Sequence, residues 1–294
     1  MISVVVVSFR STSILAKCLE ALSLELGEED EVIVIENSQD DRVAELREFT
    51  RGNFTLLMND RNVGYSRGCN QGIQLAKHDH VLLLNPDTVP VEGAVEALKS
   101  SLKTREKNAL YAVELINPDG SRQDYYRRFP SVRALLIMFF IPRKFQSRFP
   151  AYRHYTYSED YVSRCSFEQP PGAGLVVPKT SQLDEDFFVY GSDLMLCWDF
   201  AKTSCQEVAL LPIQFVHLRG QGGTSSSPDL ADWLRVESAK GFALFFAKSG
   251  QLSKKSIWVL SYGILEFCGL LRFIHQPEQR NRRKKRLWSF INNQ

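Results

Sequence analysis

The sequence predicts an α/β fold in which a mostly parallel central sheet carries helices on both faces. Short, almost continuous apolar runs alternate with segments of helical spacing through the first half of the chain. Strands this apolar must be covered on both faces, and the helices between them supply that cover. Because parallel strands need crossover connections, the alternation also predicts right-handed βαβ units.

The predicted elements follow in a regular order. Five strands are expected in this half, at 3–8, 31–38, 54–60, 80–87 and 109–117. Helices are expected between them, at 14–26, 41–50, 66–78 and 91–103. After a turn at Asn117–Ser121, further strands are expected within 170–179 and at 207–212, with a helix within 187–204 between them. A loop with several glycines, Gly220–Pro228, then leads into helices at 232–248 and 256–275.

The composition is that of a globular protein, with 44% hydrophobic and 24% charged residues in a chain of 294. No basic and apolar leader opens the sequence, so we expect no secretory signal peptide. The six cysteines form no C-x-x-C pair and no zinc spacing, and reduced thiols in a cytoplasm are expected. The motifs G-x-G-x-x-G, G-x-x-x-x-G-K-[ST], G-x-S-x-G and H-E-x-x-H are missing, which disfavours the enzyme classes that depend on them.

Basic residues gather at the C-terminus. From Gln276 onward the chain holds six of them, all within Arg280–Arg286, against the single acid Glu278. Since the net charge is only +2, the rest of the chain is mildly acidic. Proteins that bind nucleic acid place positive charge on a folded face, so no nucleic acid is expected and an anionic membrane surface fits better. A tail that is merely solvated fits the charge equally well.

Two apolar segments add to the membrane hypothesis. Leu135–Ile141 is flanked by basic residues and is too short to span a bilayer. Ile257–Ile274 is apolar almost all round a helix. Each segment is either packed in a core or lying on a membrane surface.

Polar residues stand where two of the predicted strands end. Glu36 and Asn37 close the second strand, and Asn85-Pro86-Asp87 closes the fourth. In open α/β sheets, ligands bind outside the carboxyl ends of the strands. Asn-Pro-Asp is also good turn chemistry, but two acids at the same edge favour a binding site.

A set of motifs, in this order along the chain, resembles one known family. The motifs are VVVVSFRS (4–11), VIVIENSQDD (32–41), NVGYSRGCNQGI (62–73), LLLNPDT (82–88), INPDGSRQ with RRFPS (116–131), GAGLVVPK (172–179), DEDFFVYGSDLMLC (184–197) and VHLRGQGGTS (216–225). The chain is similar to family 2 inverting glycosyltransferases of the GT-A fold, in particular the bacterial rhamnosyltransferase-like branch. The resemblance implies a GT-A domain at 1–227 and a helical C-terminal region at 228–294.

The resemblance implies roles for residues at the strand ends. Glu36, where the family usually has Asp, would accept the N3–H of uracil or thymine. Asp87 would bind Mg²⁺ or Mn²⁺, hard cations that prefer oxygen ligands. His217 would bind the metal or the pyrophosphate, although a structural histidine is an alternative. Other contacts to the nucleotide-sugar would come from Ser8, Arg10, Asn37, Gly64, Arg67, Asn70, Asn85 and Arg219.

The general base of the family comes from an acidic pair that precedes a helix. Here the first acid of that pair is Ser192, the second is Asp193, and a later Asp is Met195. The resemblance therefore implies Asp193 as the catalytic base. An acid at a helix N-terminus is the simpler structural alternative. For Gly64 and Gly68, the alternative is a glycine-assisted helix start.

These inferences predict a cytoplasmic enzyme attached peripherally to the membrane. It would transfer a sugar onto a lipid-linked bacterial surface glycan. The resemblance to the rhamnosyltransferase-like branch implies that this sugar is L-rhamnose, with dTDP-rhamnose as the donor. UDP-hexoses are alternative donors, and a homodimer is left open. A catalytically silent binding or scaffold protein is the rival, supported by the departures at Glu36, Ser192 and Met195. A nucleotidyltransferase is a weaker alternative because its glycine-rich phosphate loop is missing.

Overall fold

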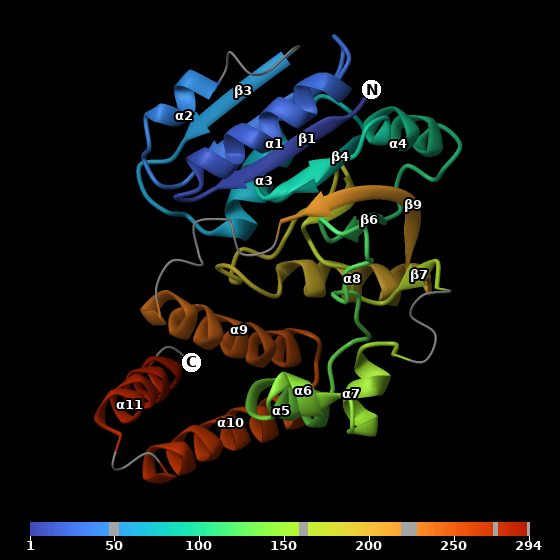
Figure 1. Cartoon of the computed structure of the whole chain (residues 1–294). Coiled ribbons are helices and arrows are strands. Elements are labelled where there is room, and N and C mark those ends of the chain that lie inside the picture. The colour runs from blue at the N-terminus through green and yellow to red at the C-terminus, as the bar shows by residue number, and fades with distance from the viewer. Residues whose placement is uncertain (47–52, 159–163, 219–227, 273–275, 293–294) are drawn as a thin grey trace.

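A nine-stranded sheet forms one half of the molecule, and a group of helices forms the other half (Figure 1). The computed structural model describes residues 1–46, 53–158, 164–218, 228–272 and 276–292. The strands are β1 (Ser3–Ser8), β2 (Glu31–Glu36), β3 (Asn53–Met58), β4 (His80–Leu84), β5 (Thr88–Pro90), β6 (Tyr111–Ile116), β7 (Ser166–Phe167), β8 (Gly174–Pro178) and β9 (Val208–His217).

The helices vary from single turns to long rods. They are α1 (Thr12–Glu25), α2 (Arg42–Glu45), α3 (Tyr65–Leu75), α4 (Ala94–Leu102), α5 (Val132–Phe140), α6 (Arg143–Gln146), α7 (Pro150–Tyr155), α8 (Ser192–Ser204), α9 (Pro228–Lys248), α10 (Leu252–Arg272) and α11 (Pro277–Ile291). Of the helix predicted over 41–50, α2 supplies the first part, and 47–50 lie outside the described residues.

The order of the strands confirms the central sheet, in which β3, β2, β1 and β4 form a parallel group. The order is β3-β2-β1-β4-β8-β6-β9-β5, with β7 paired to β9. The strands β1 to β4 run parallel to one another, and β6 runs parallel to β9. Strand β8 lies antiparallel between β4 and β6, so the fifth predicted strand does not pair with the fourth.

Each face of the sheet has its own apolar core, as the unbroken apolar strands require. Along β1, Val4 and Val6 pack in the core that contains residues of α1 and α4. Val5 and Val7 pack in the core on the opposite face, with residues of α3 and α8. This alternation follows from the two-residue period of a strand, and it holds the strand ends rigidly at one edge of the sheet.

A third core lies among the helices below α8 in Figure 1. It joins α5, α8, α9, α10 and α11 through buried side chains that include Leu135, Trp258, Tyr262 and Phe290. The Phe139 ring meets the Trp258 ring edge-on, with centroids 5.3 Å apart. The C-terminal helices are therefore anchored to α8, which begins at the candidate active site.

The segment Leu135–Ile141 packs against the third core, as the buried-helix alternative expects. Leu135 is fully buried, and Leu136, Met138, Phe139 and Phe140 pack against the third core. Apart from the exposed Arg133, the residues of α5 are apolar and pack against the neighbouring helices, which fits the buried-helix alternative.

The basic tail is also more than a solvated extension. It forms α11, in which Arg286 bridges Asp232 of α9 at 2.7 Å and Glu266 of α10 at 3.1 Å. Arg282 also contacts Asp232, and Arg283 also contacts Glu266. Because Glu266 is fully buried, it needs these cations to offset the cost of its desolvation. Three of the six basic residues thus hold the C-terminal helices together.

Helix α10 has one face in the third core and one face exposed. Trp258, Tyr262 and Glu266 are buried at intervals of four residues, as expected for one side of a helix. The exposed side carries Ile257, Leu260, Ile264 and Phe267, which are 51–65% exposed. The predicted apolar segment is therefore half core and half surface, and its last residues, 273–274, lie outside the described part. Among the described residues, no helix is both long and apolar enough to cross a bilayer.

Candidate active site

The carboxyl ends of β1, β2 and β4 lie together because these strands are parallel and adjacent. Ser8 ends β1 opposite Glu36, the last residue of β2. The Ser8 hydroxyl pairs with the Ser11 hydroxyl at 3.0 Å, which ties it to the start of α1. Arg10, in the connecting loop, has a φ of 52° and an exposed side chain. The strand ends that the sequence places at one edge of the sheet thus lie side by side in the fold.

Glu36 has a free acceptor in a buried position. Its side chain is fully buried, and one carboxylate oxygen, Oε1, accepts hydrogen bonds from the backbone and hydroxyl of Ser38. The second oxygen, Oε2, has no hydrogen-bond partner among the described residues. Because a buried carboxylate oxygen is costly to leave unpaired, this atom is suited to an N–H donor from a bound ligand.

Asn37 and Asn70 are used to hold loops in place. Asn37 donates from Nδ2 to the Gly64 carbonyl at 3.1 Å. Asn70 makes two hydrogen bonds of 2.8 Å with the backbone of Leu183, one as donor and one as acceptor. It thereby fixes the segment that leads to Asp193. Contact of these side chains with a nucleoside stays a prediction.

Gly64 is required for close packing. Its φ is +87°, and a Cβ there would lie 2.5 Å from the carbonyl oxygen of Phe188. That carbonyl accepts a hydrogen bond from the Tyr65 backbone at 2.7 Å, which locks the start of α3 to the 184–190 segment. Gly68 similarly lies against Val7. Arg67 is half exposed, with Nε 4.0 Å from a carboxylate oxygen of Glu185.

The turn at Asn85-Pro86-Asp87 brings a carboxylate beside a histidine. The Asn85 carbonyl accepts a hydrogen bond from Thr88 N at 3.0 Å, so the backbone forms the turn that Asn-Pro-Asp predicts. Strand β5 then pairs with β9, and Asp87 and His217 become neighbours. Oδ1 of Asp87 lies 3.3 Å from Nε2 of His217, and both side chains are about nine-tenths buried.

Gln123 determines which nitrogen of His217 is free. Nδ1 of His217 lies 2.9 Å from Oε1 of Gln123, and Nε2 of Gln123 donates to the His217 carbonyl at 2.8 Å. Because Oε1 can only accept, Nδ1 must carry a proton, and in neutral histidine Nε2 then presents a lone pair. Nε2 faces Asp87, so a lone pair and a carboxylate point to the same position.

Asp193 lies in the first turn of α8. Its Oδ1 accepts a hydrogen bond from Leu194 N at 2.9 Å, and its Oδ2 accepts one from Gly172 N at 3.2 Å. Burial raises the pKa of the Asp193 carboxyl above its usual value, although the backbone hydrogen bonds oppose the shift. No basic side chain bridges it within the described ranges. A carboxylate with raised proton affinity and no cation is suited to accept a proton.

The two neighbouring departures from the family pattern are buried. Ser192 is 1% exposed, and Met195 is 8% exposed in the third core. The methionine packs where α9 covers α8, so an acid at this position would be desolvated among apolar side chains. The packing of α9 on α8 thus explains why position 195 is apolar, and it leaves the hydrogen bonds of Asp193 in place.

Sequence reasoning gave no role to several residues near the site. Gln123 and Tyr125 fall in a motif that was recognised without a function being assigned to them. The Tyr125 ring centroid is 6.1 Å from that of His217. Tyr190 lies nearby: burial raises the pKa of its phenol, and Tyr125 and Asp193 raise it further. Arg219, a predicted contact, lies outside the described residues.

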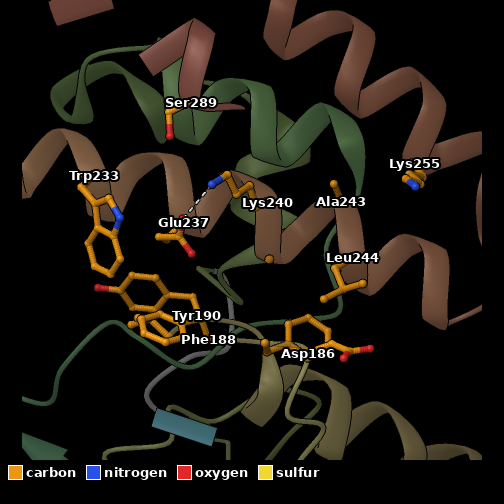
Figure 2. Close-up of a pocket in the computed structure, with 13 residues that line it drawn as sticks. Asp186, Phe188, Tyr190, Trp233, Glu237, Lys240, Ala243, Leu244, Lys255 and Ser289 are labelled. Atoms are coloured by element: carbon orange, nitrogen blue, oxygen red, sulfur yellow. Dashed lines mark hydrogen bonds and ion pairs between the residues drawn. The ribbon is translucent and has the colours of Figure 1, made fainter. Parts of the chain in front are cut away.

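A groove of about 470 Å³ lies beside Tyr190, between the 186–190 segment and α9 (Figure 2). The aromatic side chains of Phe188, Tyr190 and Trp233 gather at one end of it, and Glu237 is paired with Lys240 in its wall. A sheet edge with a paired acid and histidine, and a buried aspartate at a helix start, match the arrangement that the motifs predict for a GT-A transferase site.

Comparison with known proteins supports this class. The model of glycosyl transferase family 2 matches residues 3–167, more than half of the chain. The chain therefore belongs to glycosyl transferase family 2 and is a glycosyltransferase. No curated protein sequence gives a match.

Solved structures show the same fold at low sequence identity. Glucosyl-3-phosphoglycerate synthase from Mycobacterium tuberculosis, in complex with Mn²⁺, UDP and phosphoglyceric acid, has a TM-score of 0.55 and 18% identity over 85% of this chain and 78% of its own. The mannosyltransferase PcManGT from Pyrobaculum calidifontis, with GDP-Man and Mn²⁺, has a TM-score of 0.55 and 11% identity over 100% of this chain and 88% of its own. TarS 1-349 from S. aureus has a TM-score of 0.51 and 11% identity over 100% of this chain and 92% of its own. A longer TarS structure is covered over only 39% of its length.

Proposed function

We propose that this glycosyltransferase transfers L-rhamnose from dTDP-rhamnose to a lipid-linked bacterial surface glycan, with inversion at the sugar carbon. The observation that carries the metal-assisted transfer is the convergence of Asp87 and the Nε2 lone pair of His217 at the same sheet edge as Glu36. The choice of rhamnose rests on the resemblance of the motifs to one branch of the family. UDP-hexoses are the alternative donors.

The residues present fit a divalent cation. Asp87 supplies a hard oxygen ligand and His217 an imidazole nitrogen, a pair that suits Mn²⁺ or Mg²⁺. Within the described ranges no group of three acidic, histidine or cysteine side chains is placed to hold a metal. Such a cation would therefore depend on donor phosphate oxygens and water for its remaining ligands, as Mg²⁺ commonly does. When bound, it would offset the charge that develops on the departing diphosphate.

Glu36 and Asp193 have separate tasks in this proposal. The unpaired Oε2 of Glu36 accepts the N3–H of thymine or uracil and so orients the nucleoside. Asp193 takes the proton from the acceptor hydroxyl while that oxygen bonds to the anomeric carbon. The bond from that carbon to the nucleoside diphosphate breaks on the opposite face. One base is sufficient for direct displacement, which gives an inverted product.

Membrane attachment is the second part of the proposal, and α10 and α11 support it. Ile257, Leu260, Ile264 and Phe267 form an exposed apolar stripe, hereafter the α10 stripe. On α11, the exposed residues include Lys284, Lys285, Trp288 and Ile291. An apolar face with nearby lysines and a tryptophan is the pattern of a helix in an anionic membrane interface. An enzyme held there would meet a lipid-linked acceptor by searching in two dimensions.

A donor panel tests the proposed activity. Purified protein with Mn²⁺ is incubated with dTDP-rhamnose, UDP-glucose, UDP-N-acetylglucosamine or GDP-mannose and a lipid-linked acceptor extract, and nucleoside diphosphate release and the glycolipid product are measured. We expect dTDP-rhamnose to be consumed fastest, with an inverted linkage by NMR. Consumption of a UDP-hexose alone would replace the donor assignment. Absence of transfer with every donor, together with intact donor binding, would favour the silent binding protein.

A further inference from the structure

The groove beside Tyr190 has the composition of a carbohydrate site. Phe188, Tyr190 and Trp233 are 38%, 44% and 37% exposed, which is high for large aromatic side chains on a folded protein. The rings of Phe188 and Trp233 meet edge-on at 6.3 Å, with an interplanar angle of 87°. Figure 2 shows Tyr190 and Phe188 close together, with Trp233 above them. Aromatic faces attract the weakly positive C–H groups of a sugar ring.

The polar part of the wall complements a polyhydroxylated ligand. Glu237 and Lys240 form an ion pair of 2.9 Å, and their side chains are only 15% and 18% exposed. Lys255 and Ser289 also line the groove. A charged pair this sheltered gains from hydroxyl groups that bond to both ions, whereas a hydrocarbon chain would desolvate the pair further. The lining therefore favours a sugar over a lipid tail.

Two glycines make the groove rigid and join it to the reaction centre. A Cβ on Gly241 of α9 would lie 2.4 Å from the Tyr190 carbonyl oxygen, so only glycine permits this approach. Gly191 has a φ of +109°, and its carbonyl accepts the hydrogen bond of Met195 N in α8. Helix α9 is thus held directly against the segment that presents Asp193, three residues after Tyr190.

We propose that this groove binds a pyranose ring of the glycan acceptor, stacked on Tyr190 and Trp233 and hydrogen-bonded to Glu237 and Lys240. The inference rests on the proposed glycosyl transfer, and it assigns acceptor recognition to α9 in the C-terminal region. The volume of about 470 Å³ falls within the usual range for small-molecule sites. The ring adjacent to Tyr190 would carry the hydroxyl that reaches Asp193.

The probes are the octyl pyranosides of rhamnose, glucose, galactose and N-acetylglucosamine, titrated into the full-length protein with calorimetric detection. We expect at least one to bind, and we expect Trp233→Ala to weaken that binding about tenfold, the scale of a lost aromatic contact. Glu237→Gln should also weaken it. Phe149→Ala is the matched control, because Phe149 is 39% exposed, lies before α7 and is not part of the groove lining. It should bind like the wild type.

Two further measurements separate this inference from the proposed function. dTDP with Mn²⁺ should bind with equal affinity to the wild type and to Trp233→Ala. If dTDP binds to neither protein, the proposed function is refuted and the sugar assignment of the groove is not. Octanol tests whether the groove takes only an apolar chain. Equal affinity for octanol and the octyl pyranosides, unchanged affinity in Trp233→Ala, or no binding of any pyranoside would each overturn the sugar assignment.

Discussion

Nε2 of His217 lies 3.3 Å from Oδ1 of Asp87, at the point where β9 passes the turn that ends β4. Gln123 engages the other ring nitrogen at 2.9 Å and so leaves Nε2 as an acceptor in the neutral ring. The two residues are 130 positions apart in the chain and become neighbours through the pairing of β5 with β9. This relationship directs two electron-pair donors, a carboxylate oxygen and an imidazole nitrogen, at the same position.

Asp87→Asn should remove most metal-dependent donor binding, because the amide has no charge to attract a divalent cation. Calorimetry with dTDP and Mn²⁺ should show an affinity at least about tenfold weaker, and transfer should be almost lost. Asp79→Asn is a control, since Asp79 is exposed and paired with Lys107. Equal affinity with and without Mn²⁺ in the wild type would show that Asp87 is not a metal ligand.

Gln123→Leu should weaken Mn²⁺ binding about 10- to 100-fold in the presence of dTDP, because outer partners orient a ligating histidine. Gln214→Leu is the matched control, with an exposed glutamine that bonds to Glu114. Since Gln123 is fully buried, thermal unfolding must confirm that the variant is folded. A folded Gln123→Leu with unchanged Mn²⁺ affinity would mean that His217 needs no fixed orientation.

Asp193→Asn should leave dTDP binding unchanged and lower turnover by about 10²–10⁴-fold, the scale of a lost general base. Since burial raises the pKa of Asp193 and the base must be deprotonated, kcat/KM should fall with decreasing pH earlier than for an exposed aspartate. A pH profile that stays flat down to about pH 4, the usual value for Asp, would place the base elsewhere.

Relative to Asp193→Asn, the wild type should lose thermal stability as the pH rises through the folded-state pKa of Asp193. A raised pKa in the folded state means that ionisation of Asp193 destabilises the fold. This cost is absent below the unfolded-state pKa and complete above the folded-state pKa. The melting temperature of Asp193→Asn minus that of the wild type should therefore decrease as the pH falls toward about 4. A difference in melting temperature that stays the same between about pH 4 and about pH 7 would contradict this account.

Leu260→Asp with Ile264→Asp should reduce sedimentation with anionic vesicles at least tenfold, because the α10 stripe would no longer enter the interface. Lys284→Gln with Lys285→Gln should also reduce it, by about fivefold for each charge. Leu24→Asp, on α1 and 74% exposed, is the control. Deletion from Gln276 is unsuitable, because it would remove Phe290 from the third core. If the wild type stays in the supernatant at low salt, membrane attachment is refuted.

Sequence patterns alone predicted the first four strands, their parallel alignment and the sheet edge at which Glu36 and Asp87 lie. Unbroken apolar runs have few ways to be buried, so a sheet with helices on both faces follows from local pattern alone. The motif around Asp193 was equally readable, because a helix start is a local feature.

Roles that depend on contacts between distant residues could not be predicted and became clear from the fold. The tautomer of His217 depends on Gln123, and the groove depends on the approach of Gly241 to Tyr190. Composition also could not separate core from surface, as the buried α5 and the divided faces of α10 show. Arg282, Arg283 and Arg286 looked like a surface tail, yet they neutralise Asp232 and the buried Glu266. Burial and pairing are properties of neighbours in space, which a linear pattern does not specify.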